Sequence, residues 1–269
     1  VDSANQSLVV KEGVKRTGST SLRVDSERID SLLNLAGELV INKARFIQNH
    51  LDLEKQFGRH AKVNELKESV VTLMRIANEI QEGIMQLRMV AIDQVFNRFP
   101  RVVRDISRKL NKEINLVIEG KETELDKSVV EEIGDPLMHL VRNAVDHGIE
   151  TVESRRENKK PETGTIILRA YHQGSNIVIE IHDDGNGIDV EAVRSKAIEK
   201  GIISQEDAKN MSDRDAVNLI FLPGFSTTTQ VSDLSGRGVG MDVVKKNVDR
   251  LNVVVEIVTE KGKGSTFTI

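Results

Sequence analysis

Residues 139–150 read HLVRNAVDHGIE, and this stretch decides how the larger part of the chain folds. The tripeptide Gly-Asp-Pro at 134–136 precedes it and predicts the start of a helix, since Asp can cap and Pro favours the first turn. Gly148 predicts that the helix ends at His147. The polar residues of this stretch are therefore expected on one helix.

His139, Asn143 and His147 are spaced by four residues, so one face of that helix carries all three. Arg142 and Asp146 lie beside this face. The row offers neutral nitrogen and oxygen ligands, a hydrogen-bond partner and a proton acceptor. By itself the pattern fits a solvated helix face equally well.

A second cluster, DDGNGI at 183–188, follows a run in which Ile177, Ile179 and Ile181 point to one side of a strand. A carboxylate at a strand end, here Asp183, can accept a hydrogen bond from an amino group. Glycines two and four positions later allow a flat ligand to approach the backbone. An ordinary turn is the alternative interpretation.

A third cluster, SGRGVGM at 235–241, places three alternating glycines before a predicted helix at 241–251. Their backbone N–H groups predict an anion or phosphate site. No Gly-Lys-Ser/Thr follows, which excludes a Walker A loop, and the spacing excludes a Rossmann fingerprint. Upstream, FLPGFSTTT at 221–229 indicates a hydrophobic anchor on a mobile loop, or a surface turn with one tucked aromatic.

The strands and remaining helices of this part follow from alternation and turn residues. Strands are predicted at 114–118, 165–171, 176–182, 253–258 and 265–269, and helices at 101–110, 190–200 and 213–221. Residues 91–269 therefore form an α+β domain.

Residues 24–90 have a helical period, with a break at Gly58. Apolar residues step by four and three from Leu66 to Leu87, which is the spacing of a packed helical seam. We expect an antiparallel hairpin whose broad apolar stripe is covered by a second copy, giving a four-helix bundle in a homodimer. The alternative is a hairpin packed on the following domain. Residues 1–23 are polar and aperiodic and are interpreted as a linker.

Composition excludes several classes of function. The chain has 269 residues, with 38 Lys+Arg and 42 Asp+Glu, so its net charge of −4 argues against a nucleic-acid binder. The lack of Cys excludes disulfides and thiolate sites. No apolar run approaches the roughly 18 residues of a membrane span, so we expect no membrane insertion. Because the chain lacks an initiator Met and ends inside a strand-like run, we expect a piece of a longer protein.

Taken in order, these clusters resemble the ATP-binding domain of the GHKL (Bergerat-fold) family in its histidine-kinase form. They correspond to its N box, its Asp-x-Gly-x-Gly box, its F box and its glycine-rich box, with a last glycine box in GKGST at 262–266. Residues 139–150, 223–244 (PGFSTTTQVSDLSGRGVGMDVV) and 34–46 (NLAGELVINKARF) look like the chemotaxis histidine kinases. The resemblance covers about residues 24–269. It implies an α/β sandwich after the hairpin.

The resemblance also implies a Mg-ATP site. Asp183 would bind the adenine amino group, Gly187 would leave room for the base, and Asn143 would ligate Mg²⁺, with His147 a second ligand or a phosphate contact. His139 would orient or deprotonate the attacking imidazole as the catalytic residue. Residues 189–235 would form a lid over ATP, anchored by Phe221 and Phe225. The nucleotide-binding set would further include Arg142, Asp146, Gly185, Ile188, Lys196, Ser235, Gly236, Arg237, Gly238, Val239, Gly240 and Met241.

One departure from related kinases concerns the lid, where some carry a Lys and this chain has Thr227, Thr228 and Thr229. Either Arg237 or Lys196 would supply the missing charge. The phosphoacceptor is also expected elsewhere. His50 is followed by Leu51 instead of an acidic residue, and His60 lies in the break between the helices.

The expected function is therefore that of an ATP-dependent protein-histidine kinase core. It would phosphorylate a histidine on a separate phosphotransfer domain of the same protein, absent from this chain, for relay to response regulators. Through further absent domains it would meet an adaptor protein and chemoreceptors, placing it in the cytoplasm at membrane receptor arrays. One alternative is a clamp ATPase of the gyrase, Hsp90 or MutL type. The other is a non-catalytic dimeric scaffold in which bound nucleotide only switches the shape of the protein.

Overall fold

The computed structural model describes residues 26–58, 60–225 and 240–269 and divides into two compact units, 1–87 and 88–269. Each unit is considered by itself. Among the described residues, no helix combines the length and apolarity that crossing a membrane requires.

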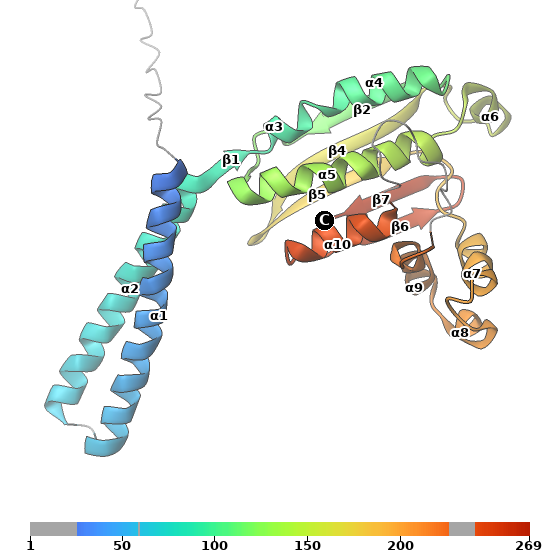
Figure 1. Cartoon of the computed structure of the whole chain (residues 1–269). Helices are drawn as coiled ribbons and strands as arrows, with labels where there is room; N and C mark the ends of the chain where they lie inside the picture. Colours follow the sequence, from blue (N-terminus) through green and yellow to red (C-terminus); the bar gives the residue numbers. More distant parts are fainter. Residues whose placement is uncertain (1–25, 59, 226–239) are drawn as a thin grey trace, which may run out of the picture. The chain divides into compact units, whose positions relative to one another are not determined.

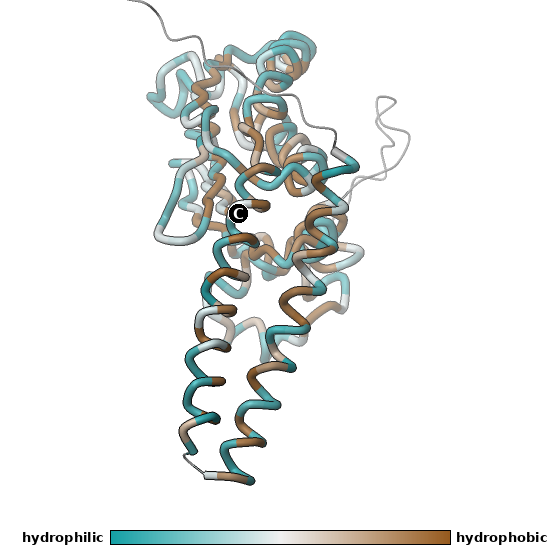
Figure 2. Tube along the Cα trace, turned by 90° about the vertical axis from the view of Figure 1, so that its left-hand side faces the viewer, coloured by the Kyte–Doolittle hydropathy of each residue, from teal (hydrophilic) through white to brown (hydrophobic). Residues whose placement is uncertain are grey.

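The first unit is the predicted antiparallel hairpin, in which α1 (Ser26–Phe57) and α2 (Ala61–Arg88) run side by side (Figure 1). Hydrophobic and hydrophilic stretches alternate along both helices (Figure 2). In α2 the buried residues are Val63, Val70 and Ala77. Of these, Val70 and Ala77 belong to the predicted seam. Leu73 and Ile80, from the same seam, remain 38% and 47% exposed. The hairpin therefore covers only part of its own stripe.

The second unit is built on a five-stranded mixed sheet with the order β2-β4-β5-β7-β6. Only β2 and β4 pair in parallel, and the other neighbours are antiparallel. The strands are β2 (Ile114–Glu119), β4 (Gly164–Gln173), β5 (Asn176–Asp183), β6 (Glu256–Glu260) and β7 (Gly264–Thr268). A separate two-stranded ribbon pairs β1 (Met89–Ala91) with β3 (Glu124–Asp126).

Three helices lie against one face of the sheet: α4 (Phe99–Lys109), α5 (Lys127–Asn143) and α10 (Met241–Arg250) (Figure 1). Leu137, Leu140 and Val141 of α5 pack in one core with Ile166, Leu168 and Ile181 of the strands, all fully or nearly fully buried. This helix-on-sheet arrangement confirms the predicted α+β class and its sandwich.

Shorter helices complete the unit. They are α3 (Asp93–Phe96), α6 (Val152–Glu157), α7 (Val190–Glu199), α8 (Gln205–Asn210) and α9 (Asp213–Asn218), with a 3₁₀ turn η2 (Leu219–Phe221) and a π-helical turn η1 (Ala144–Gly148). The helix predicted at 213–221 is thus α9 followed by a 3₁₀ turn. The strand predicted at 253–258 instead covers Glu256–Glu260.

The predicted start of the central helix at 134–136 is wrong. Helix α5 begins at Lys127, where the Asp126 carboxylate accepts the Ser128 backbone N–H at 2.8 Å. Pro136 lies inside the helix and is buried. An internal proline removes one hydrogen bond of the helix, but packing against the sheet outweighs that loss. The start of α5 is therefore set by the cap at Asp126 and not by Pro136.

Candidate functional site

A cavity of about 420 Å³ opens in the second unit where α5, η1, α7 and α10 meet the ends of β5 and β7. Polar and apolar walls contribute to it. Its lining comprises His139, Asn143, Ala144, His147, Gly148, Asp183, Gly187, Ile188, Lys196, Ile220, Phe225, Gly240, Met241, Ser265 and Phe267.

The structure brings His139, Asn143 and His147 together on this cavity, as their spacing predicts. The helix changes its winding between the second and third of them. At η1 the Ile149 backbone N–H bonds to the Ala144 carbonyl at 2.8 Å, five residues back instead of four. Single π-helical turns of this kind are frequent at functional sites.

Lys112 holds the π-helical turn from outside. Its ammonium donates to the carbonyl oxygens of Val145 at 2.8 Å and Asp146 at 2.7 Å. Burial lowers the pKa of Lys112, and the carboxylates of Asp146 and Glu150 partly oppose that shift. The lysine thus supplies hydrogen bonds to two carbonyls of the turn.

Asn143 and Met241 connect the two helices at the cavity. The Asn143 side-chain amide donates to the Met241 sulfur at 3.0 Å. Met241 is the first residue of α10, after Gly240. Because its nitrogen is engaged, the amide presents its oxygen as the atom able to ligate a cation.

Asp183 is the buried acid of the cavity, with an exposed fraction of 2%. Its Oδ1 accepts the Gly185 backbone N–H at 3.0 Å. Burial raises the pKa of Asp183 to about 6, against the backbone hydrogen bonds from Gly185 and Ser265 that lower it. At neutral pH the group is therefore a buried carboxylate with capacity to accept another hydrogen bond.

The turn after Asp183 needs glycine for reasons of backbone packing. A Cβ on Gly185 would lie 2.0 Å from the carbonyl oxygen of Gly148. Gly187 has φ +67°, and a Cβ there would lie 2.3 Å from the Glu260 carbonyl oxygen. Gly187 lines the cavity, whereas Gly185 joins the turn to the end of η1.

The electrostatic setting of His139 favours its neutral form. Burial lowers the pKa of His139, and the neighbouring Arg142 cation lowers it further. Asp242 and Asp146 act in the opposite direction. A neutral imidazole at pH 7 can accept a proton or orient a reacting group.

Lys196 of α7 is the ammonium group that lines the cavity, and its Nζ lies 5.4 Å from the centre of the Phe225 ring. Lys200, the residue that follows α7, donates to the carbonyl oxygens of Gly224 at 2.6 Å and Phe225 at 3.0 Å. Phe225 is therefore contacted by one lysine at its ring and by another at its carbonyl oxygen.

The other expected site residues divide into three groups. Ile188, Gly240 and Met241 line the cavity, whereas Arg142, Asp146 and Gly185 are not among its lining residues. Ser235, Gly236, Arg237, Gly238 and Val239 lie outside the described residues, as do Thr227, Thr228 and Thr229.

Sequence reasoning missed five lining residues: Ala144, Gly148, Ile220, Ser265 and Phe267. Ser265 falls in the glycine box at 262–266, and Ala144 and Gly148 fall in the stretch 139–150, so both motifs carried a signal. Ile220 and Phe267 are apolar residues without a distinguishing pattern.

Comparison with known families gives two matches. Residues 19–87 match the homodimeric domain of signal transducing histidine kinases. Residues 132–269 match the family described as histidine kinase-, DNA gyrase B- and HSP90-like ATPase. These two ranges contain the hairpin and the cavity respectively.

Similar proteins extend these matches. The sensor histidine kinase CheAY of Helicobacter pylori is 53% identical over 254 residues, covering 94% of this chain and 31% of the relative. The chemotaxis protein CheA of Bacillus subtilis is 47% identical over 252 residues, covering 94% and 36%. This chain thus spans about a third of the length of these relatives. A histidine kinase domain from a blue-light activated histidine kinase of Erythrobacter litoralis gives a TM-score of 0.38 at 13% identity, covering 90% of this chain and 92% of the other.

Proposed function

The chain belongs to the histidine kinase-, DNA gyrase B- and HSP90-like ATPase family, and we propose that it is the dimerisation and catalytic core of a chemotaxis histidine kinase. It binds Mg-ATP in the cavity and transfers the γ-phosphoryl group to a histidine of a separate phosphotransfer domain. The observation that carries the proposal is the buried Asp183 carboxylate, in one cavity with Asn143, His147 and Lys196.

The base of the nucleotide is bound at the Asp183 end of the cavity. The carboxylate accepts a hydrogen bond from the exocyclic amino group of adenine, while Ile188, Ile220 and Phe267 supply apolar walls. A buried acceptor rejects a base without a matching donor, because its own hydrogen bond is then lost.

Asn143 and His147 are the residues proposed to hold Mg²⁺. They offer an amide oxygen and an imidazole nitrogen on one wall of the cavity. Among the described residues, no group of three His, Asp or Glu gathers to form a metal site by itself. The site fits an ion that keeps water and phosphate oxygens as ligands, as Mg²⁺ does. When bound, the ion neutralises phosphate charge.

His139 is the proposed catalytic residue and acts on the acceptor. Its neutral imidazole accepts a hydrogen bond from the acceptor histidine or takes its proton, leaving the other ring nitrogen to attack the γ-phosphorus. ADP leaves as the bond between its terminal oxygen and that phosphorus breaks. Lys196 and Gly240 line the cavity and bind the phosphates, and the same role is proposed for Gly236 and Gly238, which lie outside the described residues. Positioning and charge stabilisation account for most of the acceleration.

The proposed partners follow from the two domains. The hairpin forms a homodimer, as the match to the homodimeric domain supports. His50 is buried, with its Nε2 4.0 Å from the Glu54 carboxylate, which supports an acceptor outside the hairpin. Response regulators, an adaptor protein and chemoreceptors are the proposed partners of the longer protein. Its proposed place is the cytoplasmic side of membrane receptor arrays.

The test supplies labelled Mg-ATP and a separately produced histidine-phosphotransfer domain. We expect acid-labile, base-stable label on that domain. The His139→Gln variant should lower the rate by about 100-fold or more while changing ATP affinity less than threefold. Release of free phosphate without labelling would instead support a clamp ATPase. Binding of ATP with neither product would support a nucleotide-switched scaffold.

A further inference from the structure

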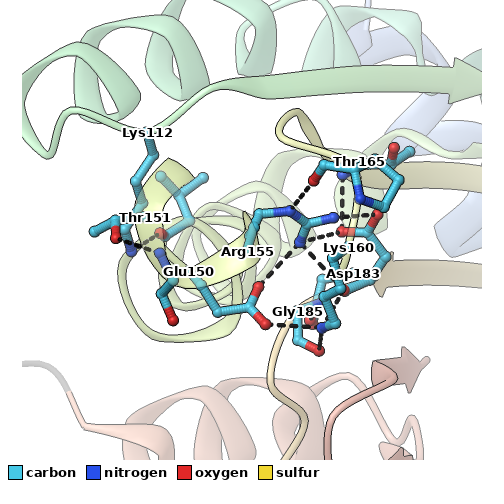
Figure 3. A network of polar contacts seen from close by, with 12 residues as sticks. Lys112, Glu150, Thr151, Arg155, Lys160, Thr165, Asp183 and Gly185 are labelled. Atoms are coloured by element: carbon cyan, nitrogen blue, oxygen red, sulfur yellow. Dashed lines mark hydrogen bonds and ion pairs between the residues drawn. The ribbon is translucent and has the colours of Figure 1, made fainter. Parts of the chain in front are cut away.

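We propose that Arg155, together with Glu150 and Lys160, is a positioning group that orients the Asp183 carboxylate and thereby sets the preference for an amino-bearing base. This inference rests on the proposed nucleotide site. None of the three residues lines the cavity. They act through the turn of residues 183–185, which begins at the last residue of β5 (Figure 3).

Arg155 is the centre of this network and is 1% exposed. Its Nη1 donates to Asp184 Oδ1 at 3.1 Å and its Nη2 to Asp184 Oδ2 at 3.0 Å. The same Nη1 donates to Glu150 Oε2 at 2.9 Å, and Nε donates to the Pro161 carbonyl at 2.6 Å. The planar guanidinium thus grips Asp184 with two parallel hydrogen bonds, which fixes orientation as well as distance.

The Lys160 side chain binds the backbone of the same turn. Its ammonium donates to the carbonyl oxygens of Asp184 at 2.9 Å and Gly185 at 2.7 Å. It also donates to Glu150 Oε1 at 2.8 Å. Glu150, whose side chain is 2% exposed, therefore joins both cations, and the two carboxylates balance the two cations.

The network reaches Asp183 through the turn that it holds. The Asp184 carboxylate accepts the Thr165 backbone N–H at 2.9 Å, which ties the turn to β4. The Gly185 backbone N–H shares its peptide plane with the Asp184 carbonyl that Lys160 holds, and it donates to Asp183 Oδ1 at 3.0 Å. One carboxylate oxygen is thus held by the turn, and the carboxylate is oriented for a base in the cavity.

Stability alone is a poor explanation for such a network. Burying two cations and two carboxylates costs desolvation energy, and well-packed apolar residues often do equally well or better. Apolar residues could not hold the carbonyl oxygens of Asp184 and Gly185 in fixed directions, however. What the charged network adds, compared with apolar packing, is a fixed orientation of this turn. Second-layer contacts of this kind commonly control how well a binding group is placed.

The experiment compares Arg155→Met with Arg156→Met in the full chain. Arg156 is the adjacent arginine, exposed and paired with Glu162, so it is a matched control. Affinities for non-hydrolysable ATP and for the corresponding inosine nucleotide, which carries an oxo group in place of the amino group, are measured by competition. Far-ultraviolet circular dichroism and a melting curve establish folding of each variant.

We expect Arg155→Met to weaken the binding of ATP by about tenfold or more and that of the inosine nucleotide by less than threefold. The preference for ATP over the inosine nucleotide therefore falls. Arg156→Met should leave both affinities unchanged. Equal weakening of both nucleotides, or unchanged discrimination in a folded Arg155→Met, would overturn the positioning role. If Arg155→Met does not fold, Lys160→Met, which removes the contacts to the two carbonyls, is judged by the same criteria. A parent protein that does not bind ATP, or does not discriminate, would instead refute the proposed nucleotide site.

Discussion

Asn143 donates its amide N–H to the sulfur of Met241 at 3.0 Å, which joins the end of α5 to the first residue of α10. The contact links two motifs that are far apart in the sequence. It also leaves the Asn143 amide oxygen available for the proposed role as a Mg²⁺ ligand.

Replacing Asn143 by Ala should remove the benefit that Mg²⁺ gives to ATP binding. We expect ATP affinity without Mg²⁺ to change less than threefold, and the gain on adding Mg²⁺ to fall by roughly tenfold. Calorimetric titration with and without Mg²⁺ measures both values. Met241→Leu is the control, since it removes the sulfur contact but keeps the amide oxygen. An unchanged Mg²⁺ effect in Asn143→Ala would contradict the ligand assignment.

Replacing Asp183 by Asn should weaken ATP binding by roughly 10- to 100-fold, because an amide cannot present the same acceptor to the adenine amino group. The fold should persist, since the variant removes a buried charge. Calorimetry gives the affinity and circular dichroism the fold. Asp189→Asn, at a partly exposed carboxylate, is the control. Normal ATP affinity in Asp183→Asn would refute the pocket assignment.

The pKa of Asp183, raised by burial from 3.8 to about 6, predicts a pH dependence of stability. The folded state binds this proton more tightly than the unfolded state, so the stability that protonation gives is present below about pH 4. It is lost as pH rises through 6, by about 3 kcal/mol.

Chemical denaturation of the parent and Asp183→Asn between pH 4 and 7 measures this dependence. The parent should lose stability relative to the variant as pH rises. The lowered pKa of His139 gives the opposite slope, because its unfolded form binds the proton more tightly, but it acts in both proteins and cancels in the difference. A difference that does not vary with pH would contradict the raised pKa.

Replacing Lys112 by Met should lower the free energy of unfolding by about 1–3 kcal/mol, because two carbonyls of the π-helical turn lose their charged donor. Weaker Mg-ATP binding should accompany it, since His147 lies on that turn. Denaturant titration and calorimetry measure the two effects. Lys109→Met, at an exposed position on α4, should change neither the free energy of unfolding nor Mg-ATP binding. Equal stability of the two variants would show that Lys112 does not support the turn.

Introducing Glu at Ile80 should convert dimers into monomers, since this 47% exposed side chain belongs to the apolar seam of α2. Sedimentation velocity distinguishes the two states. Arg75→Glu places the same charge on the opposite helix face and should leave the dimer intact. A dimer that survives Ile80→Glu would argue against a bundle built on this seam.

Much of the architecture could be predicted because it depends on local patterns. Alternating isoleucines indicated β5, and the strands predicted at 165–171 and 176–182 correspond to β4 and β5, which pair antiparallel. The spacing of His139, Asn143 and His147 placed them on one cavity even though the helix changes winding between them. A periodic pattern tolerates such a local change when the core faces stay buried.

Long-range polar contacts could not be predicted in the same way. Residues 155–160 read RRENKK, which is typical of a solvated surface, yet Arg155 is fully buried and Arg156 is exposed. The difference arises from Asp184, a partner distant in the sequence. Likewise, nothing local distinguishes Lys112, which finds its acceptors in the π-helical turn, from its exposed neighbour Lys109.

The parallel pairing of β2 with β4 has a consequence for the order of folding. This ladder joins residues 114–119 to 164–169, and the segment that connects the two strands contains β3, α5 with its π-helical turn, and α6. Contacts between such distant segments carry a large loop-closure cost and tend to form late. The β4–β5 hairpin is local and can form early. A partly folded chain would then have strands but no cavity, so nucleotide binding would report the last stage of assembly.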